Sequence, residues 1–541
     1  MISKYHVRAV ASLADAIVCH LQRTGTRAIF GVPGGGGTLD LIEAAGRAGL
    51  PFVLTATETA GAIAAIAQAE LTGQPGACLT TLGPGAASVV NGVACALLER
   101  TPLLVFTDAS ADQFTHQQLD HRALFAPITK WSSRLTADGA DRVLAHAVAT
   151  AIAPPAGPVH LDCLAETAIK GTVPFIAVSS TEGEKVEVKG PGPLTTDFCD
   201  LLTQSRRPMV VAGLGARGAE DVAALRQFLE RRNVPAMVTY KAKGVVPEHH
   251  PCFAGVFTNA AIERPMVERS DLIIGVGLDP VELLPRPWTY PHPIVSVGRW
   301  PAADTHVPFA AQLVTNIPAA IAAMAACVTT TEWDLDDIQR RVVEQRHRID
   351  IPVRGLSAQR ATTLVADALA TRTRVTVDAG AHMFAATMMW PVGEPNGMLI
   401  SNGLSTMGFA LPAAIGAALV DRDRSVVALT GDGGLLMCAG ELLTAAREKL
   451  RIITIVFNDA SLSLIEIKQQ RKRYQPAGVA LGAVDWRAVA EAFGVTAFQA
   501  ANELELTRAV KDAIQVDGPS LVDVTIDRSN YGATLHAIRG S

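Results

Sequence analysis

The chain alternates short apolar runs with glycine-rich turns and amphipathic stretches. Near the N-terminus, apolar residues at helical spacing predict a helix with one buried face, on which His20 is expected to be a core or boundary histidine. A strand at residues 27–32 and a glycine loop at 34–37 follow. The order of strand, turn and helix continues to about residue 170. This order is typical of a parallel sheet covered on both faces.

The same α/β pattern returns twice further along the chain. Residues 179–193 are polar and lack apolar periodicity, which predicts a linker. A charge-rich stretch at 329–354 predicts an exposed helix that joins domains. We therefore expect three parallel-sheet α/β domains, at residues 1–175, 192–328 and 356–541.

The first and last blocks share one order of strand, glycine loop, helix and strand. The first has ACLTT, LGPG, AASVVNGVACALLER and PLLVF, and the last has VVALT, GDGG, LLMCAGELLTAAREKL and RIITIVF. We interpret them as related domains that flank a third, and duplication is a hypothesis.

Composition narrows the class of protein. With 541 residues the chain has room for three or four domains. Apolar residues make up 49% and charged residues 18%, which excludes a disordered chain, and a net charge of −5 gives no basic surface for nucleic acid. The eight cysteines are scattered and predict neither a zinc site nor a disulfide framework. Asp15 interrupts the N-terminal apolar run, and no later run is long enough to span a bilayer, so we expect a cytoplasmic protein.

The strongest chemical signal is Gly431-Asp432-Gly433-Gly434, followed one strand later by Asn458-Asp459. Glycines at the turn into a helix present backbone N–H groups and the helix dipole to a diphosphate. Asp432 and Asp459 follow successive parallel strands, so we expect their carboxylates to be neighbours. Two oxygen ligands beside a diphosphate describe a Mg²⁺ site.

Two other motifs leave alternatives open. Glu58 opens a helix of small apolar residues, and by itself it fits a helix-start acid with Thr57 as the cap. In the middle block, Gly213-x-Gly215-x-x-Gly218 lies between a strand and a helix, as a dinucleotide fingerprint requires. The next strand ends in Thr239-Tyr240-Lys241 instead of an acid, which argues against a Rossmann oxidoreductase.

Gly-Asp-Gly followed by Asn-Asp resembles the signature of thiamine diphosphate (ThDP) enzymes. Over essentially the whole chain, the resemblance is to the acetolactate synthase-like branch of that family. The segments that carry it are FGVPGG at 30–35, GPG at 83–85, HQQLDHRALFAPITK at 116–130, NGLSTMGFALPAAIGAAL at 402–419 and the GDGG and FND motifs.

The resemblance implies a pyrimidine-binding first domain, a central Rossmann-like domain and a diphosphate-binding last domain. It implies that Asp432, Asp459 and the backbone carbonyl of Ser461 bind Mg²⁺. The family often has Ser at 434, where Gly keeps the amide and loses a hydroxyl. Further positions implied to contact ThDP are Gly34, Gly35, Ala381, His382, Gly403, Thr406, Met407, Gly431, Gly433 and Gly434.

The resemblance gives Glu58 a catalytic role. Its position is that of the glutamate that hydrogen-bonds N1′ of the aminopyrimidine. A carboxyl in a dry pocket there promotes the imino tautomer that removes the thiazolium C2 proton, and the cofactor then serves as the electron sink. Met407 takes the position of the apolar residue that bends the cofactor.

The substrate side is less defined. The first domain lacks the histidine pair of pyruvate decarboxylases, so strong acid–base groups are sparse and carboligation is favoured. His116 and Gln117 are the polar candidates near the substrate, with Gly35 and Lys468 as further candidates. Lys468 stands where biosynthetic members have Trp, and it either meets an anionic acceptor or lies on a solvated helix face. Flavin-binding members carry Arg-Phe-Asp-Asp where LDPVELL follows Gly277, so FAD is disfavoured.

The expected activity is that of a ThDP- and Mg²⁺-dependent carboligase that decarboxylates a 2-oxo acid, pyruvate first, and joins it to a second carbonyl compound. One alternative is non-oxidative decarboxylation. The other is a non-catalytic nucleotide-binding homologue, and the presence of Glu58 and the metal motif argues against this second alternative. Family members place the cofactor between the first domain of one subunit and the last domain of another, which implies a homodimer or homotetramer. The donor, the acceptor and the oligomer size stay open.

Overall fold

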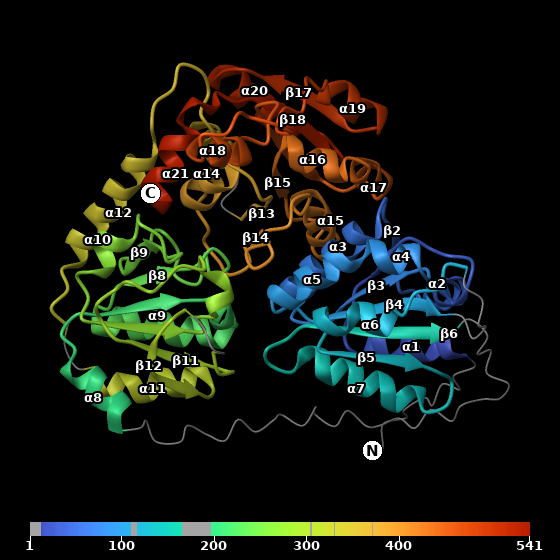
Figure 1. The fold of residues 1–541 in the computed structure, drawn as a ribbon, viewed down its shortest axis with the longest axis horizontal. Helices are drawn as coiled ribbons and strands as arrows, with labels where there is room; N and C mark the ends of the chain where they lie inside the picture. The colour runs from blue at the N-terminus through green and yellow to red at the C-terminus, as the bar shows by residue number, and fades with distance from the viewer. Residues whose placement is uncertain are drawn as a thin grey trace. The chain divides into compact units, whose positions relative to one another are not determined.

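The computed structural model describes residues 12–109, 116–164, 196–302, 306–328, 331–369 and 372–540. The predicted linker at 179–193 lies outside the described residues, as do the predicted domain ends at 165–175 and 192–195. Within the described residues, the strands form three six-stranded parallel sheets, which confirms the predicted fold class (Figure 1).

By its contacts the chain divides into two compact units, whereas the sequence predicted three domains. Unit 1 contains the first sheet together with Leu411–Asp423 and Cys438–Leu450. Unit 2 contains the second and third sheets.

The first sheet has the strand order β2-β1-β3-β4-β6-β5. Every residue of its central strands β3 and β4 is buried, because helices cover both faces. His20 lies at the edge of this core with Nε2 2.6 Å from Asp141 Oδ1, which confirms the boundary histidine. The strands are β1 (Ile29–Gly31), β2 (Phe52–Leu54), β3 (Gly76–Thr80), β4 (Leu103–Ala109), β5 (Trp131–Leu135) and β6 (Pro158–Leu164). The helices are α1 (Leu13–Arg23), α2 (Gly37–Ala48), α3 (Glu58–Thr72), α4 (Pro84–Ser88), α5 (Val90–Leu98), α6 (His121–Phe125) and α7 (Ala140–Ile152).

The second sheet, in unit 2, has the order β12-β11-β10-β7-β8-β9. The predicted joining helix forms as α12 (Leu335–Ile349), but one face is buried through Ile338, Val342 and Ile349, where the sequence predicted an exposed helix. Its strands are β7 (Pro208–Ala212), β8 (Ala236–Val238), β9 (Phe253–Val256), β10 (Leu272–Val276), β11 (Ile294–Gly298) and β12 (Phe309–Val314). Its helices are α8 (Thr196–Gln204), α9 (Ala219–Arg232), α10 (Arg264–Val267) and α11 (Ile317–Cys327).

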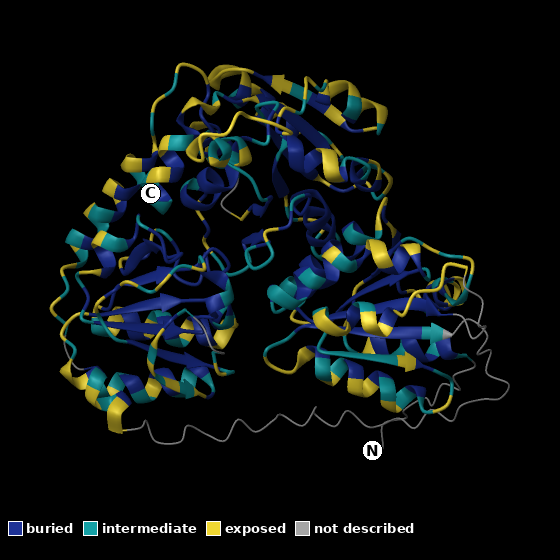
Figure 2. Cartoon of the chain, viewed as in Figure 1, coloured by how far each residue is buried: buried dark blue, intermediate teal, exposed yellow. Residues whose placement is uncertain are grey.

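The third sheet has the order β14-β13-β15-β16-β18-β17, and its strands are largely buried (Figure 2). Among the described residues, no helix of the chain is both long and apolar enough to cross a membrane. The strands are β13 (Arg374–Val377), β14 (Met398–Ile400), β15 (Val426–Gly431), β16 (Ile452–Asn458), β17 (Thr496–Ala500) and β18 (Ser520–Thr525). The helices are α13 (Ala358–Ala368), α14 (His382–Met389), α15 (Ala410–Val420), α16 (Asp432–Cys438), α17 (Glu441–Arg447), α18 (Ser463–Arg471), α19 (Trp486–Ala492), α20 (Glu503–Ile514) and α21 (Tyr531–Arg539).

Candidate active site

Two carboxylates lie at the ends of neighbouring strands of the third sheet. β15 and β16 pair in parallel up to Gly431 and Phe457, so Asp432 and Asp459 follow adjacent strand ends, as predicted. Asp432 is 5% exposed, and its Oδ1 accepts from the Gly433 amide at 2.8 Å. Its Oδ2 is buried without a hydrogen-bond partner among the described residues. Such an orphaned acceptor needs a donor or a cation, because an unpaired buried acceptor is costly.

Both carboxylate oxygens of Asp459 accept hydrogen bonds from the residues that follow it. Its Oδ1 accepts from the Ser461 amide at 3.0 Å, and its Oδ2 accepts from the Ser463 hydroxyl at 2.9 Å. Burial, and then the charge of Asp432, raise the pKa of Asp459 to about 6, and burial raises the pKa of Asp432. Two neighbouring carboxylates whose pKa values are raised by burial fit a site for a small hard cation with oxygen ligands.

A cavity of about 330 Å³ lies against these carboxylates within unit 2. Its wall includes the glycine turn, the start of α14, the first turns of α18, and residues of α21. The structure therefore brings most of the predicted cofactor residues of the last domain together. Those on the wall are Ala381, His382, Met407, Gly431, Asp432, Gly433, Gly434, Asp459, Ser461 and Lys468.

Two predicted residues of the last domain do not line this cavity. Ser405 lines it, whereas the neighbouring Gly403 and Thr406 do not. Thr406 is buried, and its amide donates to the Ser401 hydroxyl at 3.1 Å. Within unit 2, this hydrogen bond therefore holds the backbone next to Met407.

The glycines at 433 and 434 are required by space. A Cβ on Gly433 would lie 2.7 Å from Leu462 Cδ2, and a Cβ on Gly434 would lie 2.7 Å from Asp378 Oδ2. The Ser that related sequences often carry at 434 would press on that carboxylate here. Gly434 thus lets the turn pass close to Asp378 and keeps its amide near the cavity.

Asp378 is a site-building residue that the sequence reasoning missed. It follows β13, is fully buried, and accepts from the Gly408 amide at 2.9 Å and from the Thr430 hydroxyl at 3.1 Å. It therefore ties the segment after Met407 to the end of β15. Burial raises its pKa to about 6. In the sequence, its one mark is that it directly follows an apolar strand.

The side chain of His382 was also missed, since only its backbone was predicted. It stacks on Phe457 with ring centroids 5.2 Å apart, and its Nε2 is buried without a hydrogen-bond partner among the described residues. Burial lowers its pKa to about 4, so the ring is neutral near pH 7. A neutral imidazole with an open nitrogen on the cavity wall can donate to or accept from a bound ligand.

Two cationic side chains, Lys468 and Arg539, lie on the cavity wall outside the metal motif. Lys468 is exposed on α18, and Arg539 ends α21. The Arg539 guanidinium lies over the Phe384 ring at 4.7 Å, and within the described residues it pairs with no carboxylate. Burial lowers the pKa of Arg539. A desolvated guanidinium without a carboxylate partner is suited to a ligand anion.

Glu58 lies in unit 1 and begins α3. The Thr57 hydroxyl accepts from the Ala60 amide at 3.2 Å, so the predicted helix cap is present. The Glu58 side chain is half-buried within its own unit. A Cβ built on Gly85 would lie 3.2 Å from Glu58 Oε1, so the backbone of the GPG loop passes directly against this carboxyl.

The other predicted residues of unit 1 divide into packed and open positions. A Cβ on Gly34 would lie 2.2 Å from the Thr81 hydroxyl, whereas nothing lies within 4 Å of one on Gly35. Gln117 has φ of 57° and lines a second cavity, of about 540 Å³, which His116 and Glu58 do not line. His116 is exposed. Unit 1 by itself therefore leaves His116 and Glu58 apart from this second cavity.

Sequence profiles of known families match all three sheets. The thiamine pyrophosphate enzyme N-terminal TPP binding domain matches residues 11–124, the central domain matches 195–324, and the C-terminal TPP binding domain matches 378–524. Thiamine pyrophosphate is another name for ThDP. The C-terminal match contains the carboxylates and glycines of the cavity, and the N-terminal match contains Glu58.

Curated relatives match over almost the whole length. The chain is 29% identical to the catabolic acetolactate synthase of Raoultella terrigena, with 96% of each chain covered. It is 28% identical to the acetolactate synthase of Bacillus subtilis (strain 168), over 96% of this chain and 93% of the relative. It is 28% identical to the acetolactate synthase isozyme 2 large subunit of Escherichia coli (strain K12), over 95% of each. Site geometry, domain matches and relatives agree that the chain belongs to the thiamine pyrophosphate enzyme family and is an acetolactate synthase-like member of it.

Proposed function

We propose that this protein is a Mg²⁺- and ThDP-dependent carboligase that decarboxylates a 2-oxo acid, with pyruvate as the first candidate, and joins the remaining fragment to a second carbonyl compound. The observation that carries the proposal is the buried, unpartnered Oδ2 of Asp432 on the wall of the 330 Å³ cavity, beside Asp459 and the glycine amides. A carboxylate of this kind is suited to a cation, and amides at a helix start are suited to an anion.

The residues present fit the cofactor. Asp432, Asp459 and the Ser461 carbonyl would hold Mg²⁺, and the amides of Gly434 and the Ala381–His382 turn would donate to the diphosphate. The Gly433 amide, which donates to Asp432 Oδ1 here, would have to change partner to join them. When bound, ThDP supplies a nucleophilic carbon and an electron sink. Met407 presents an apolar side chain on the same wall, where it would support the cofactor.

Glu58 supplies the proton chemistry on the pyrimidine side. Its Oε1 would share a proton with the ring nitrogen N1′, and the Gly85 backbone lies close to this carboxyl.

The cavity wall favours carboligation over simple decarboxylation. Apolar residues form much of it, including Leu462, Leu464 and Ile465. His382 is neutral, and burial raises the pKa of Tyr531 well above its ordinary value, so neither side chain is a ready proton donor. With these two wall residues unable to donate a proton readily, attack on a second carbonyl competes against protonation.

Arg539 and Lys468 give the proposal its substrate class. Both are cations on the wall, and Arg539 pairs with no carboxylate within the described residues. We assign them to the carboxylate of the 2-oxo acid or of an acidic acceptor. Arg539→Gln is expected to raise the KM for the acid about ten-fold and to leave the Kd for ThDP within about two-fold. Arg487→Gln, which changes an exposed side chain of α19, is the control. An Arg539→Gln enzyme with unchanged KM, or with weakened ThDP binding, contradicts this assignment.

The central sheet is proposed to work without FAD. In its glycine loop, the Leu214 amide donates to Glu282 Oε2 at 2.9 Å, and the Thr239 hydroxyl donates to Glu282 Oε1 at 2.5 Å. Burial raises the pKa of Glu282 to about 7. The protein's own carboxyl thus holds the amide that a dinucleotide diphosphate would need. Purified protein should lack the visible absorbance of a flavin, and a flavin released on denaturation would overturn this proposal.

The deciding experiment is a panel of 2-oxo acids and carbonyl acceptors with product identification. With ThDP and Mg²⁺, pyruvate should release CO₂ and yield acetolactate. Acetaldehyde as the sole product would favour the decarboxylase. Failure of the protein to bind ThDP, or of every acid to release CO₂, would favour a non-catalytic homologue.

The assembly proposed from the family resemblance is a homodimer or homotetramer acting in the cytoplasm. In that arrangement, Glu58 and Asp432 of one site belong to different subunits. Glu58→Gln and Asp432→Asn chains are each expected to be inactive alone, and co-assembled they should recover about a quarter of the activity, since a random dimer mixture holds that share of intact sites. Recovery of no activity, together with a monomeric sedimentation profile, would contradict the shared site.

A further inference from the structure

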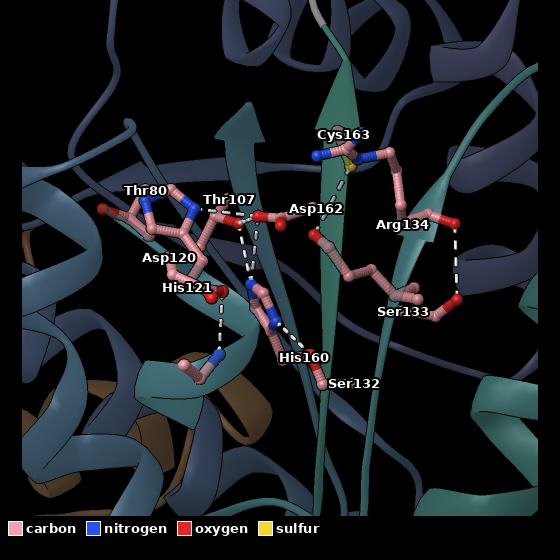
Figure 3. A network of polar contacts seen from close by, with 12 residues as sticks. Thr80, Thr107, Asp120, His121, Ser132, Ser133, Arg134, His160, Asp162 and Cys163 are labelled. Carbon is pink, nitrogen blue, oxygen red and sulfur yellow. Dashed lines mark hydrogen bonds and ion pairs between the residues drawn. The ribbon is translucent and has the colours of Figure 1, made fainter. Parts of the chain in front are cut away.

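A chain of hydrogen bonds in unit 1 joins His121, Asp162, Thr107, His160 and Ser132 (Figure 3). The Gly83 amide donates to His121 Nε2 at 3.1 Å, and His121 Nδ1 lies 2.8 Å from Asp162 Oδ1. The Thr107 hydroxyl donates to the same oxygen at 2.6 Å. His160 Nε2 contacts Thr107 Oγ1 at 2.8 Å, and its Nδ1 contacts the Ser132 hydroxyl at 2.8 Å.

The partners fix the direction of every bond in this chain. Burial acts to raise the pKa of Asp162, but the close donors His121 Nδ1 and Thr107 Oγ1 lower it, with His160 Nε2 farther away at 3.4 Å, so the carboxylate accepts throughout. His121 therefore donates from Nδ1, and its unprotonated Nε2 accepts from Gly83. Since the Thr107 proton goes to Asp162, Thr107 accepts from His160 Nε2, and His160 Nδ1 accepts from Ser132. Each buried polar atom on this path has a partner of the right kind.

The same three side chains could in principle hold a metal ion, since the ligand atoms of His121, His160 and Asp162 lie within 4.8 Å of one another. The Gly83 amide argues against it. A metal on His121 Nδ1 would move the ring proton to Nε2, where it would face the Gly83 N–H donor at 3.1 Å. Binding a metal would thus break the bond that anchors the loop.

The anchored loop touches two predicted active-site residues. Gly83 has φ of 56°, and a Cβ there would lie 2.2 Å from the Gln117 carbonyl oxygen. Two residues later, the backbone of Gly85 passes against Glu58 Oε1. His121 therefore holds the start of a loop that is packed between the Glu58 carboxyl and the Gln117 backbone.

We infer that His121, oriented by Asp162, is a positioning residue for the pyrimidine side of the ThDP site, acting through the Gly83 amide on the loop that confines Glu58. The inference rests on the proposed function. It assigns His121 no proton transfer to the substrate. Its effect is on the geometry of Glu58, so it should appear in cofactor affinity and in kcat, and not in the KM for the 2-oxo acid.

Two substitutions separate the two ends of the histidine. His121→Gln places an amide oxygen near the former Nε2 and can still accept from Gly83, while its contact with Asp162 is lost. His121→Asn places an amide near the former Nδ1 and can still donate to Asp162, while the Gly83 amide is left unpaired. If His121 served only to hydrogen-bond Asp162, the Asn variant would bind ThDP better than the Gln variant. The positioning role predicts the reverse order.

The test measures the Kd for ThDP at saturating Mg²⁺ by intrinsic fluorescence, with kcat, KM for pyruvate and the melting temperature without cofactor. His121→Asn should weaken ThDP binding about ten-fold, and His121→Gln should stay within about three-fold of the parent enzyme. His20→Asn is the matched control, because His20 pairs with Asp141 in the same unit without touching the loop. It should leave the ThDP affinity unchanged even if the melting temperature falls.

Each other outcome counts against the inference. Equal ThDP affinity in the Asn and Gln variants, or a larger loss with Gln, would show that the Gly83 bond does not position the site. Stoichiometric Zn²⁺ binding by the parent protein that is lost in both variants would establish the metal site instead. If the parent protein itself binds no ThDP, the proposed function fails, and that result is separate from a failure of the variants.

Discussion

The first and third sheets have the same topology, but they differ in how fully the acids at their strand ends are hydrogen-bonded. Numbered within each sheet, the strands follow one order, 2-1-3-4-6-5, whereas the second sheet runs 6-5-4-1-2-3. In the first sheet, the acid near the end of the fourth strand is Asp108, which accepts from the Thr38 amide at 2.9 Å and the Thr38 hydroxyl at 3.1 Å. In the third sheet, Asp459 follows the fourth strand and is likewise held by the Ser461 amide and the Ser463 hydroxyl, whereas Asp432, after the third strand, keeps a buried oxygen without a partner among the described residues.

The difference teaches how one fold can build two halves of a cofactor site. Where the protein satisfies its own carboxylate, as at Asp108, the strand end is closed and structural. Where it leaves an acceptor open, as at Asp432, the strand end is prepared for a cation. Topology sets where a site can lie, and the unpaired atom decides whether one is there.

The largest expected effect comes from exchanging these two acids for amides. Asp432→Asn should reduce kcat/KM at least about 1,000-fold and weaken Mg²⁺-supported ThDP binding, because a metal ligand is lost. Asp108→Asn should lower the free energy of unfolding by about 1–3 kcal/mol and leave ThDP binding nearly unchanged. Titration calorimetry and denaturant unfolding of both variants check this. Similar ThDP affinity in the two variants would remove the contrast between the sheets.

The next effect separates binding from chemistry. Glu58→Gln should lower kcat about 100-fold or more, while the Kd for ThDP changes by less than about ten-fold, because the amide keeps the contact and loses the shareable proton. Steady-state kinetics with a separate binding titration distinguish the two quantities. Full activity in this variant would refute the role of Glu58.

A smaller effect compares the loop glycines that follow the third strand of each sheet. A Cβ on Gly85 would lie 2.2 Å from Thr80 Oγ1 and 3.2 Å from Glu58, and one on Gly434 would lie 2.9 Å from Thr430 Oγ1 and 2.7 Å from Asp378. Gly434→Ala should therefore raise the Kd for ThDP about ten-fold, whereas Gly85→Ala should act mainly on kcat. If both variants changed the Kd for ThDP and kcat to the same extent, this difference between the two loops would be contradicted.

The smallest effect concerns pH. Glu441 in unit 1 accepts from the amides of Ala56 and Thr57, and burial raises its pKa to about 6. A folded-state pKa above the unfolded value means that the folded protein binds the extra proton, so stability falls as pH rises from about 4 to about 6. Glu441→Gln should remove roughly 1–2 kcal/mol of that fall. Unfolding curves at pH 4, 5, 6 and 7 test this, and parallel profiles for the two proteins would contradict it.

Much of the fold could be predicted because it depends on local signals. Apolar strands, glycine turns and small-residue helices such as α3 mark themselves along the chain, and parallel strand ends place Asp432 beside Asp459. The metal motif was found for the same reason, since its spacing follows the strands. The motif residues nevertheless stay candidates for their chemical roles until they are tested.

The residues that were missed depend on contacts between distant segments. Asp378 joins the Met407 segment to β15 across the sheet, and Arg539 reaches the cavity from the last helix. Neither stands in a recognisable motif. The sequence indicates no role for His121, because its partners Gly83 and Asp162 lie far from it in the chain. Tertiary hydrogen bonds of this kind leave no periodic trace.

Unit 1 also bears on how the protein is made. It includes Leu411–Asp423 and Cys438–Leu450 in addition to the first sheet. During synthesis, the N-terminal sheet would emerge long before those two segments and would wait for them with its contact surface uncovered. The nascent chain therefore has a long window in which chaperone binding matters, and a fragment ending after the first sheet should aggregate more readily than the full chain.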